Sequence, residues 1–380
     1  MPKEITRHIK RDVERELWGR AAARCQFKGC NELLYKSPLT QEKIHLAEKA
    51  HIWSHSENGP RGRGPLAADA DKLNGVENLL LVCPGCHEEL DKNNGNGRYT
   101  GELLKDWKRE HEDRIRIVTG ISAEKRSLVV LYGARIGEEK SPLHFGTCAS
   151  ALFPDWHPTD DRAINLSMSS SLDDSLESYW SVEADHLRRE FDRHVKPRVE
   201  SGEVFHVSLF GLAPQPLLIL LGSLMTDKVP SRAYQLHRST SKWDWQTSQQ
   251  KVEFKIVRPS NVSGPPALVI SLSGKIDEGR IRKALGEEMT IWEVTIETPH
   301  NDFIKSAADV GGFMAVIPPL MEQIASTHPG MDILSIFPAM PVSCAIELGR
   351  CRMPKAHAPW RIYDQHIKHG GFIPTITIGE

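Results

Sequence analysis

Four cysteines in the first quarter of the chain have the spacing of a metal site. Cys25 and Cys30 are separated by four residues, and Cys83 and Cys86 are separated by two. Such a gap lets both thiolates of a pair reach one tetrahedral zinc ion, and two pairs complete its coordination. Because four thiolates leave no open position, we expect a structural zinc ion that stabilises the surrounding fold. The alternative is four small buried cysteines without a metal.

Two histidines and an asparagine lie between and just after these cysteine pairs. His51 ends one strand-like stretch, Asn78 opens the next, and His87 follows the last cysteine in CPGCHEELD. This order, interleaved with a four-cysteine zinc site, resembles the HNH (ββα-metal) endonuclease motif over about residues 20–110. The resemblance implies that His51 is the general base, with His55 as a rival. It also implies that His87 binds a catalytic magnesium or manganese ion, and that Asn78 holds the loop or orients the His51 ring.

The chemistry implied by this resemblance is hydrolysis of a phosphodiester bond in double-stranded DNA. The reaction needs an activated water molecule and positive charge near the phosphate, and a histidine with a pKa near neutrality suits the role of base. The alternative is a zinc-ribbon binding module in which both histidines are structural.

The position directly before His51 departs from the motif. Many HNH enzymes have an acidic residue or a histidine there as a second metal ligand, and this chain has Ala50. Asp91 lies four residues after His87, a spacing that puts both side chains on one face of a helix. We therefore expect Asp91 to complete the catalytic metal site. Glu48 is the other candidate, although strand alternation puts it on the face opposite His51.

Arg61 and Arg63 stand between glycines in the loop SENGPRGRGP, close to these residues in the sequence. We expect them to contact the DNA backbone, because guanidinium groups bind phosphate; the alternative is a solvated loop. The overall charge gives little support for a nucleic-acid partner, since 48 Lys+Arg against 50 Asp+Glu give a formal net charge of −2. We interpret this balance as compatible with a nuclease that stays off DNA until it receives a signal.

The patterns around these residues predict the elements that must position them. IHLAEKAHIWSH and VENLLLVC are typical of short strands, and PGCHEELDKN indicates a turn that opens a helix. Thr100 is the predicted cap of a further helix. The stretch 118–127 is the predicted linker. The fold class is therefore α+β for a first domain at 1–117 and α/β for a second at 128–380.

The second domain contains an internal repeat, 204–234 and 331–363. Phe210 matches Phe337 and Gly222 matches Gly349 at a constant offset, and in each copy an apolar strand leads through a proline-containing turn into an apolar helix. The pattern predicts a duplicated domain of two α/β halves.

The two repeats, LFGLAPQPLLILLG and IFPAMPVSCAIELGR, together with SKWDWQ and the final WRIYD, resemble the SAVED domain. In that family two CARF-like (Rossmann-like) halves bind cyclic oligonucleotides in bacterial anti-phage signalling. The order of the two domains resembles the HNH–SAVED effector nucleases of CBASS immunity. The resemblance implies an anti-phage DNA endonuclease that is switched on by a cyclic di- or trinucleotide, and a homo-oligomer, a dimer or larger on activation.

Rossmann-like halves place ligands at the carboxyl ends of their strands, and nucleotide bases stack on aromatic or guanidinium groups. The candidate ligand-binding residues are Arg135, Pro214, Gln215, Trp243, Trp245, Pro341, Arg350, Trp360 and Tyr363.

The rest of the sequence limits the setting. Its 380 residues exceed one ordinary core, and it contains no apolar run of the roughly 20 residues that a membrane span needs. The charged start of the chain predicts a cytoplasmic protein without a membrane partner. Two rival functions remain: a restriction-like HNH nuclease whose second domain reads modified DNA, and a non-catalytic zinc-ribbon sensor of a nucleotide.

Overall fold

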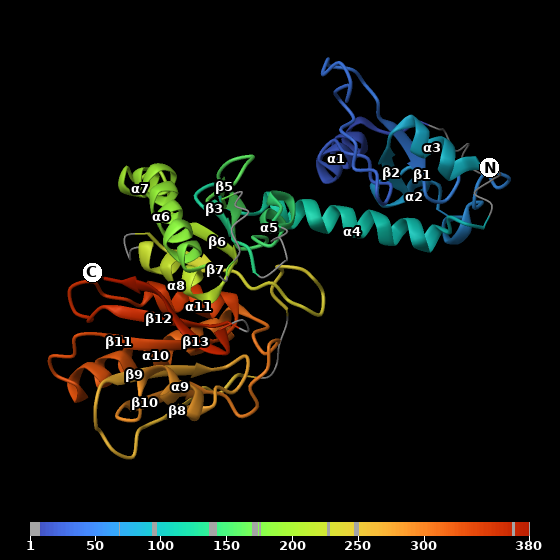
Figure 1. Cartoon of the computed structure of the whole chain (residues 1–380). Helices are drawn as coiled ribbons and strands as arrows, with labels where there is room; N and C mark the ends of the chain where they lie inside the picture. The colour runs from blue at the N-terminus through green and yellow to red at the C-terminus, as the bar shows by residue number, and fades with distance from the viewer. Residues whose placement is uncertain are drawn as a thin grey trace. The chain divides into compact units, whose positions relative to one another are not determined.

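The structure is a computed structural model that describes residues 8–67, 69–92, 97–136, 143–168, 174, 176–225, 229–246, 251–366 and 369–379. The chain forms two compact units, Met1–Ser122 and Ala123–Glu380 (Figure 1). The division falls within the predicted linker, whose first residues continue the last helix of the first unit.

The first unit is built around a two-stranded antiparallel sheet. In it His51 pairs with Leu79, so the end of the first strand meets the start of the second. The elements of the unit are α1 (Arg11–Ala21), β1 (Glu48–His51), the 3-10 turn η1 (Gly64–Leu66), α2 (Ala70–Leu73), η2 (Val76–Asn78), β2 (Leu79–Val82), α3 (Pro84–Asp91) and α4 (Gly101–Thr119). The order β1, β2, α3 is the predicted ββα order.

Local signals in the sequence account for α4, the longest helix of this unit. The hydroxyl of Thr100 accepts a hydrogen bond from the N–H of Leu103 at 3.2 Å, which confirms the predicted cap of α4. Buried positions Leu104, Lys108 and His111 follow at helical spacing. All four residues of β2 are buried in the core of the unit. β2 carries none of the predicted catalytic or metal-binding side chains, and it pairs with β1, which carries Glu48 and His51.

The second unit contains two mostly parallel sheets joined by helices. The first sheet has the order β4-β3-β6-β7 with β5 paired to β3, and the second has the order β13-β12-β11-β9-β10-β8. The elements of the first half are β3 (Arg126–Gly133), α5 (Phe145–Ser150), β4 (His157–Pro158), β5 (Ile164–Asn165), α6 (Glu177–His194), α7 (Lys196–Glu200), β6 (Val207–Leu212), α8 (Gln215–Leu224) and β7 (Ser231–Ala233). Those of the second half are β8 (Lys255–Val257), β9 (Pro266–Ser271), α9 (Glu278–Leu285), β10 (Thr290–Thr295), α10 (Ala307–Thr327), β11 (Leu334–Ala339), α11 (Val342–Arg350), β12 (Trp360–His366) and β13 (Gly371–Ile378).

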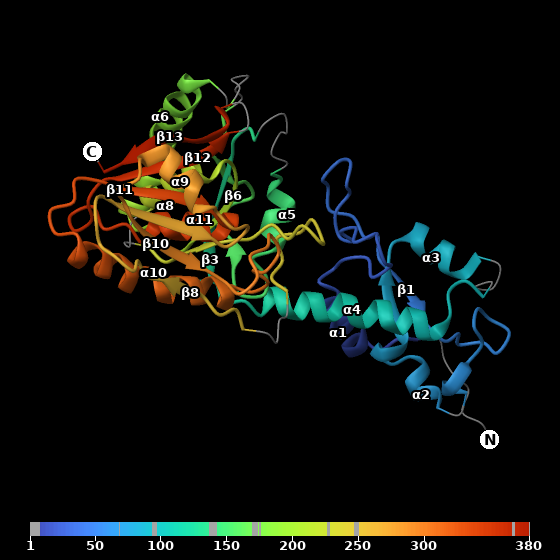
Figure 2. The same cartoon turned by 60° about the horizontal axis from the view of Figure 1, so that its bottom comes forward.

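Each sheet is covered on both faces, as parallel sheets generally are. Leu268 and Ile270 on β9 pack into the large core that includes residues of α8, α10 and α11. The alternate residues Ala267 and Val269 pack instead with Ile281 of α9. Figure 2 shows α9 and α10 against this sheet. This arrangement explains why the strands are apolar runs without a polar face.

The two halves repeat one another at the predicted offset. Phe210 stacks on Tyr234 with ring centroids 4.5 Å apart, and Phe337 stacks on Tyr363 at the same separation. The helices α8 and α11 of the two copies pack directly on each other.

This helix pair is the centre of the duplicated unit. A Cβ atom on Gly222 would lie 1.9 Å from the carbonyl oxygen of Ile346, and one on Gly349 would lie 2.0 Å from that of Ile219. The contacts are reciprocal, as a pseudo-two-fold relation between the halves requires. The glycines are therefore needed for the close approach of the two helix backbones.

Candidate functional site

The four predicted zinc ligands lie together in the first unit. The sulfur atoms of Cys25, Cys30, Cys83 and Cys86 are all within 4.8 Å of one another. The N–H of Cys83 also points to the sulfur of Cys25 at 3.4 Å. The donor set, its clustering and its partial burial fit a closed tetrahedral zinc site. Such a site would join the start of α3 to the segment that follows α1.

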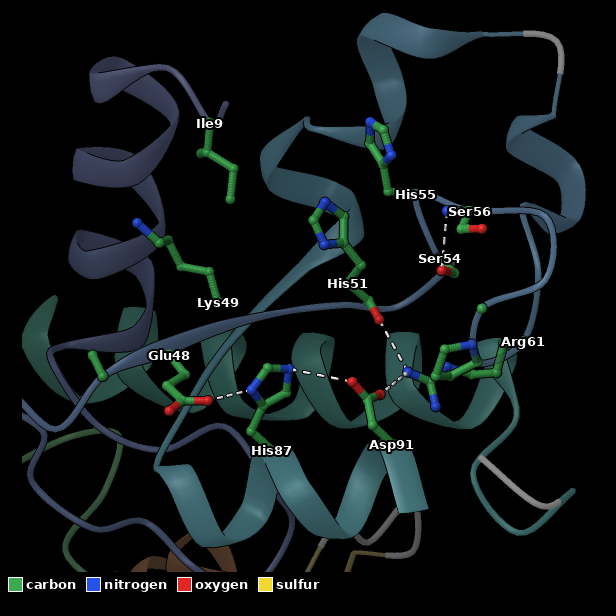
Figure 3. A pocket seen from close by; sticks show the side chains of 13 residues that line it. Ile9, Glu48, Lys49, His51, Ser54, His55, Ser56, Arg61, His87 and Asp91 are labelled. Atoms are coloured by element: carbon green, nitrogen blue, oxygen red, sulfur yellow. Dashed lines mark hydrogen bonds and ion pairs between the residues drawn. The ribbon is translucent and has the colours of Figure 1, made fainter. Parts of the chain in front are cut away.

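A pocket of about 590 Å³ lies beside β1 and α3 (Figure 3). It brings together the predicted base and the predicted metal ligands. Its lining includes Glu48, Lys49, His51, His55, Arg61, His87 and Asp91. β1 has a hydrogen-bonded neighbour only in β2 among the described strands.

The His51 ring is held from one side by an asparagine that the motif does not contain. Its Nε2 lies 3.1 Å from Oδ1 of Asn74. Burial lowers the pKa of His51 below 6.5, against the opposing effect of the Asn74 hydrogen bond. The ring is therefore neutral at physiological pH, as a general base must be.

Asn78 holds the loop and does not touch the His51 ring. Its Oδ1 accepts from the N–H of Trp53 at 2.9 Å, while its Nδ2 donates to the carbonyl of Trp53 at 2.9 Å and to that of Leu73 at 2.8 Å. The side chain is buried, and these bonds tie the backbone after β1 to the end of α2. Of the two roles predicted for Asn78, the structure therefore shows the first.

His87 lies between two carboxylates. Its Nε2 is 3.4 Å from Oδ2 of Asp91, so the two side chains share a helix face as their spacing predicts. Its Nδ1 contacts Oε2 of Glu48. The hydrogen bond to Asp91, together with that to Glu48, raises the pKa of His87 despite its partial burial.

The position of Glu48 corrects the sequence expectation. Alternation puts Glu48 and Ala50 on the side of β1 away from His51, and on this ground Glu48 was expected to be the weaker candidate. The pocket, however, is lined by side chains from both faces of this four-residue strand. Glu48 thus supplies a carboxylate to the pocket from two residues before Ala50.

Arg61 does not have the exposed position expected of a phosphate contact. Its side chain is only 6% exposed, and its guanidinium donates to the carbonyls of Ile52, Leu90 and His51 and to the carboxylate of Asp91. All these bonds fix the backbone and one carboxylate of the pocket. Arg61 therefore acts as a structural clamp of the pocket, and a contact with DNA stays a prediction for this residue.

Arg63 also bonds within its own loop. It donates to the carbonyl of His55 at 3.2 Å and to Glu57 at 3.1 Å, and its side chain is 25% exposed. A role in binding DNA stays a prediction for Arg63.

The candidate ligand residues of the second unit are in part core residues. Trp360 is fully buried, and Trp243 and Tyr363 are 3% and 5% exposed. Trp243 packs edge-on against Phe210, and Tyr363 belongs to the stack described above. Rings enclosed in this way have no face for a nucleotide base, so the structure places these three in the packing of the strands and not at a ligand surface.

Pro214 and Pro341 occupy equivalent positions in the two copies, and Gln215 directly follows the first of them. Pro214 and Pro341 are the N-cap residues of α8 and α11, and both are buried. Oε1 of Gln215 accepts from the N–H of Met340 at 3.1 Å, so it links the two helix starts. The N–H of Ser343 in the first turn of α11 is bonded to a side chain of the other half and is not available to a phosphate.

Arg350 has a structural contact as well. Its Nη1 donates to the carboxylate of Glu347 at 2.6 Å and to the carbonyl of Ser231 at 3.1 Å. It thereby joins α11 to the edge strand β7. Arg135 and Trp245 are half-buried, and the Trp245 ring stacks on Tyr234 at 5.7 Å. These two, Gln215 and Arg350 are the predicted ligand residues that retain partial exposure.

Sequence reasoning missed one residue of the first unit that acts on the pocket and did not predict the surroundings of another. Asn74 contacts the base from 23 positions away in the chain, and no local pattern marks such a pair. Arg61 was found, but its role was assigned from its loop composition, which gave no signal of its burial.

In the described part of the chain, no helix combines the length and the apolar character needed to cross a membrane.

Comparisons with known proteins identify the second unit. A family model, "SAVED: SMODS-associated and fused to various effectors sensor domain", matches residues 187–378. The curated proteins gave no significant match.

The solved structures similar to this chain include Cap4 SAVED/CARF-domain containing receptors from two bacteria. The receptor of Acinetobacter baumannii with the cyclic trinucleotide 2'3'3'-cAAA is 12% identical, with a TM-score of 0.43 over 77% of this chain and 61% of that one. The receptor of Moraxella osloensis is 12% identical, with a TM-score of 0.41 over 77% and 59%. The chain thus spans less than two thirds of the receptors it matches. Because the family model covers half of the sequence, from α6 to β13, the chain belongs to the SAVED family.

Proposed function

We propose that this protein is a metal-dependent DNA endonuclease whose activity is controlled by a cyclic oligonucleotide bound to its SAVED unit. The observation that carries the nuclease part is the pocket of Figure 3, where a neutral histidine and a histidine between two carboxylates lie together on a ββα framework. The sequence resemblance to HNH endonucleases gives these residues their roles.

The protein's own groups would carry out the proton transfer. His51 takes a proton from water, and the resulting hydroxide attacks the phosphorus of the DNA backbone. Arg61 holds the carbonyl of His51 and the carboxylate of Asp91 at the same time, so it keeps the base and the metal-binding group in a fixed relation.

A catalytic magnesium or manganese ion fits the chemistry of the donors, since carboxylate oxygens are the ligands these ions prefer. We propose that His87, Asp91 and Glu48 hold it. The two carboxylates lie against different nitrogens of the His87 ring, so one of the three side chains must turn for all to contact one ion. When bound, the ion would supply positive charge for the phosphate and the leaving oxygen.

The second unit supplies the control. The family is described as a sensor domain fused to effectors, and the duplicated halves offer a pseudo-two-fold site that suits a ring of two or three nucleotides. The half-buried Trp245, Arg135 and Gln215 are the residues we propose for the ligand. A ligand that binds the active assembly more tightly shifts the protein toward it.

The proposal includes the setting implied by the resemblance: an anti-phage effector in the cytoplasm, acting on double-stranded DNA. Because one HNH site cuts one strand, we propose that ligand binding drives a homo-oligomer, a dimer or larger, that pairs two sites.

The experiment is a plasmid-cleavage panel with magnesium or manganese and a set of cyclic di- and trinucleotides. We expect linear or degraded DNA with the cognate nucleotide and none when a chelator removes the metal. Site-selective cutting without any nucleotide would support a restriction-like enzyme instead. Nucleotide binding without cleavage under any condition would support a non-catalytic sensor.

A further inference from the structure

The two nitrogens of the His51 ring have different surroundings. Nε2 lies 3.1 Å from the amide oxygen of Asn74. An amide oxygen only accepts hydrogen bonds, so the ring must donate through Nε2–H. A neutral imidazole has one proton, and the lone pair is then left on Nδ1.

The His51 ring lies in the pocket that also holds the proposed metal-binding groups. In Figure 3 the β1 ribbon passes between the His51 ring and the side chains of His87 and Asp91, and all three line the same pocket. Because Nε2 is engaged by Asn74, Nδ1 is the ring nitrogen that can accept a proton from a water molecule in this pocket.

The segment that carries Asn74 is fixed to the segment that carries His51. Asn74 directly follows α2, whose last residue, Leu73, is buried. Asn78 donates to the carbonyl of Leu73 at 2.8 Å and holds both backbone groups of Trp53, two residues after His51. One buried amide therefore sets the spacing between the base and its partner.

We propose that Asn74 is a positioning residue that fixes the tautomer and orientation of His51, so that Nδ1 is the atom that accepts the proton from water. The inference rests on the proposed nuclease function and assigns a role to a residue outside the HNH motif. The step balances: the water O–H bond breaks and its proton goes to Nδ1. The water oxygen then bonds to phosphorus, the P–O3′ bond breaks, the 3′ oxygen takes a proton from solvent, and Nδ1 returns its proton to solvent.

The first test reads the tautomer directly. The full chain is labelled with ¹⁵N-histidine, and the ring signals of His51 are assigned by their loss in His51→Gln. We expect the Nε2–H tautomer in the wild type and a mixture of tautomers in Asn74→Leu. An Nδ1–H tautomer in the wild type, or an unchanged tautomer in Asn74→Leu, overturns the proposal.

This measurement does not depend on cleavage, so the two proposals can fail separately. A wild-type protein with the expected tautomer that cuts no DNA under any condition would contradict the proposed function and leave the positioning of His51 standing. A protein that cuts DNA through the opposite tautomer would contradict the positioning alone.

The second test uses kinetics on activated protein. Asn74→Leu should lower kcat by about 10- to 100-fold, the usual effect of losing a group that orients an active residue, with KM for DNA within about twofold of wild type. Asn74→Asp places a carboxylate against Nε2–H and should keep the tautomer, while it moves the acid limb of the pH profile upward by about one unit.

Lys72→Ala is the matched control. Lys72 lies on α2, two residues before Asn74, and its side chain is 71% exposed and pairs with Asp69. We expect wild-type kcat and an unchanged pH profile. Equal losses of kcat in Asn74→Asp, Asn74→Leu and Lys72→Ala would show that the segment matters only for stability, and would overturn the proposal.

Discussion

His51 and His87 line the same pocket, but their pKa values are shifted in opposite directions. Burial lowers the pKa of His51, whereas the hydrogen bonds to Asp91 and Glu48 raise that of His87. Two similar side chains thus acquire different roles from their surroundings, as pairs of titratable groups in active sites often do. At neutral pH the His51 ring is unprotonated, whereas the His87 ring lies against the carboxylates of Glu48 and Asp91.

The pH dependence of cleavage follows from the lowered pKa of His51. The neutral ring is the base, so protonation on lowering the pH removes activity. Because burial lowers the pKa from 6.5, we expect the activity of the ligand-activated enzyme to be level at pH 7–8 and to fall only below pH 6.5. His51→Ala should reduce the rate by about 10²- to 10⁴-fold. An acid limb centred above pH 7, or a His51→Ala enzyme of normal rate, would contradict this assignment.

Arg61 gives a second prediction at this scale. Arg61→Met removes a nearly buried clamp and leaves several carbonyls without a donor, so it should destabilise the first unit by about 2–4 kcal/mol. Arg63→Ala, in the same loop but more exposed, should cost less than about 1 kcal/mol. Thermal unfolding of both variants checks this. Wild-type stability together with reduced DNA binding in Arg61→Met would instead support a contact between Arg61 and a DNA phosphate.

At the scale of elements, the four clustered cysteines lie at α3 and in the segment after α1, and we propose that a zinc ion bound to them stabilises the ββα framework. Removing zinc with a strong chelator should unfold the first unit. The second unit, which has its own core, should keep its unfolding transition. Calorimetry with and without chelator would show the loss of one transition of two. An unchanged scan after verified zinc removal would mean that the cysteines are not needed for folding.

The contact between α8 and α11 leads to another prediction for an element. Gly349→Ala forces a Cβ to within 2.0 Å of the Ile219 carbonyl and 2.8 Å of the Ser223 nitrogen. Backbone atoms cannot rotate away, so the helices must separate, at a cost of about 3 kcal/mol. Gly311→Ala on α10 meets no atom within 4 Å and should stabilise the unit by about 0.5–1 kcal/mol. Equal effects in denaturant titrations would refute the close approach.

Features that depend on a few neighbouring residues could be predicted from the sequence, whereas contacts between residues far apart in the chain could not. The spacing of His87 and Asp91 placed both on one helix face, and Thr100 was found as a cap, because both depend on a few neighbouring residues. The pairing of His51 with Asn74 depends on how two segments fold together.

Aromatic residues in the second unit show a second limit of prediction from the sequence. Trp243, Trp360 and Tyr363 were expected at a ligand surface because bases stack on such rings. The same rings have large apolar areas, and their burial stabilises the core into which they pack. Composition does not separate these two uses, so only the structure showed that the three rings belong to the core.

At the scale of the whole molecule, the chain combines the pocket that we propose for metal-dependent DNA cleavage with a duplicated unit of the SAVED family. A formal net charge of −2 gives weak nonspecific attraction to DNA, which suits an enzyme that must remain inactive without its signal. The account requires that nucleotide binding and cleavage be coupled.

The most direct measurement of that coupling is the rate of plasmid cleavage in magnesium, with and without the cognate cyclic oligonucleotide, for wild type and His51→Ala. The account predicts rapid cleavage only by the wild type with the nucleotide, and background rates in the other three samples. Full cleavage by the wild type without nucleotide, or nucleotide-dependent cleavage by His51→Ala, would contradict it.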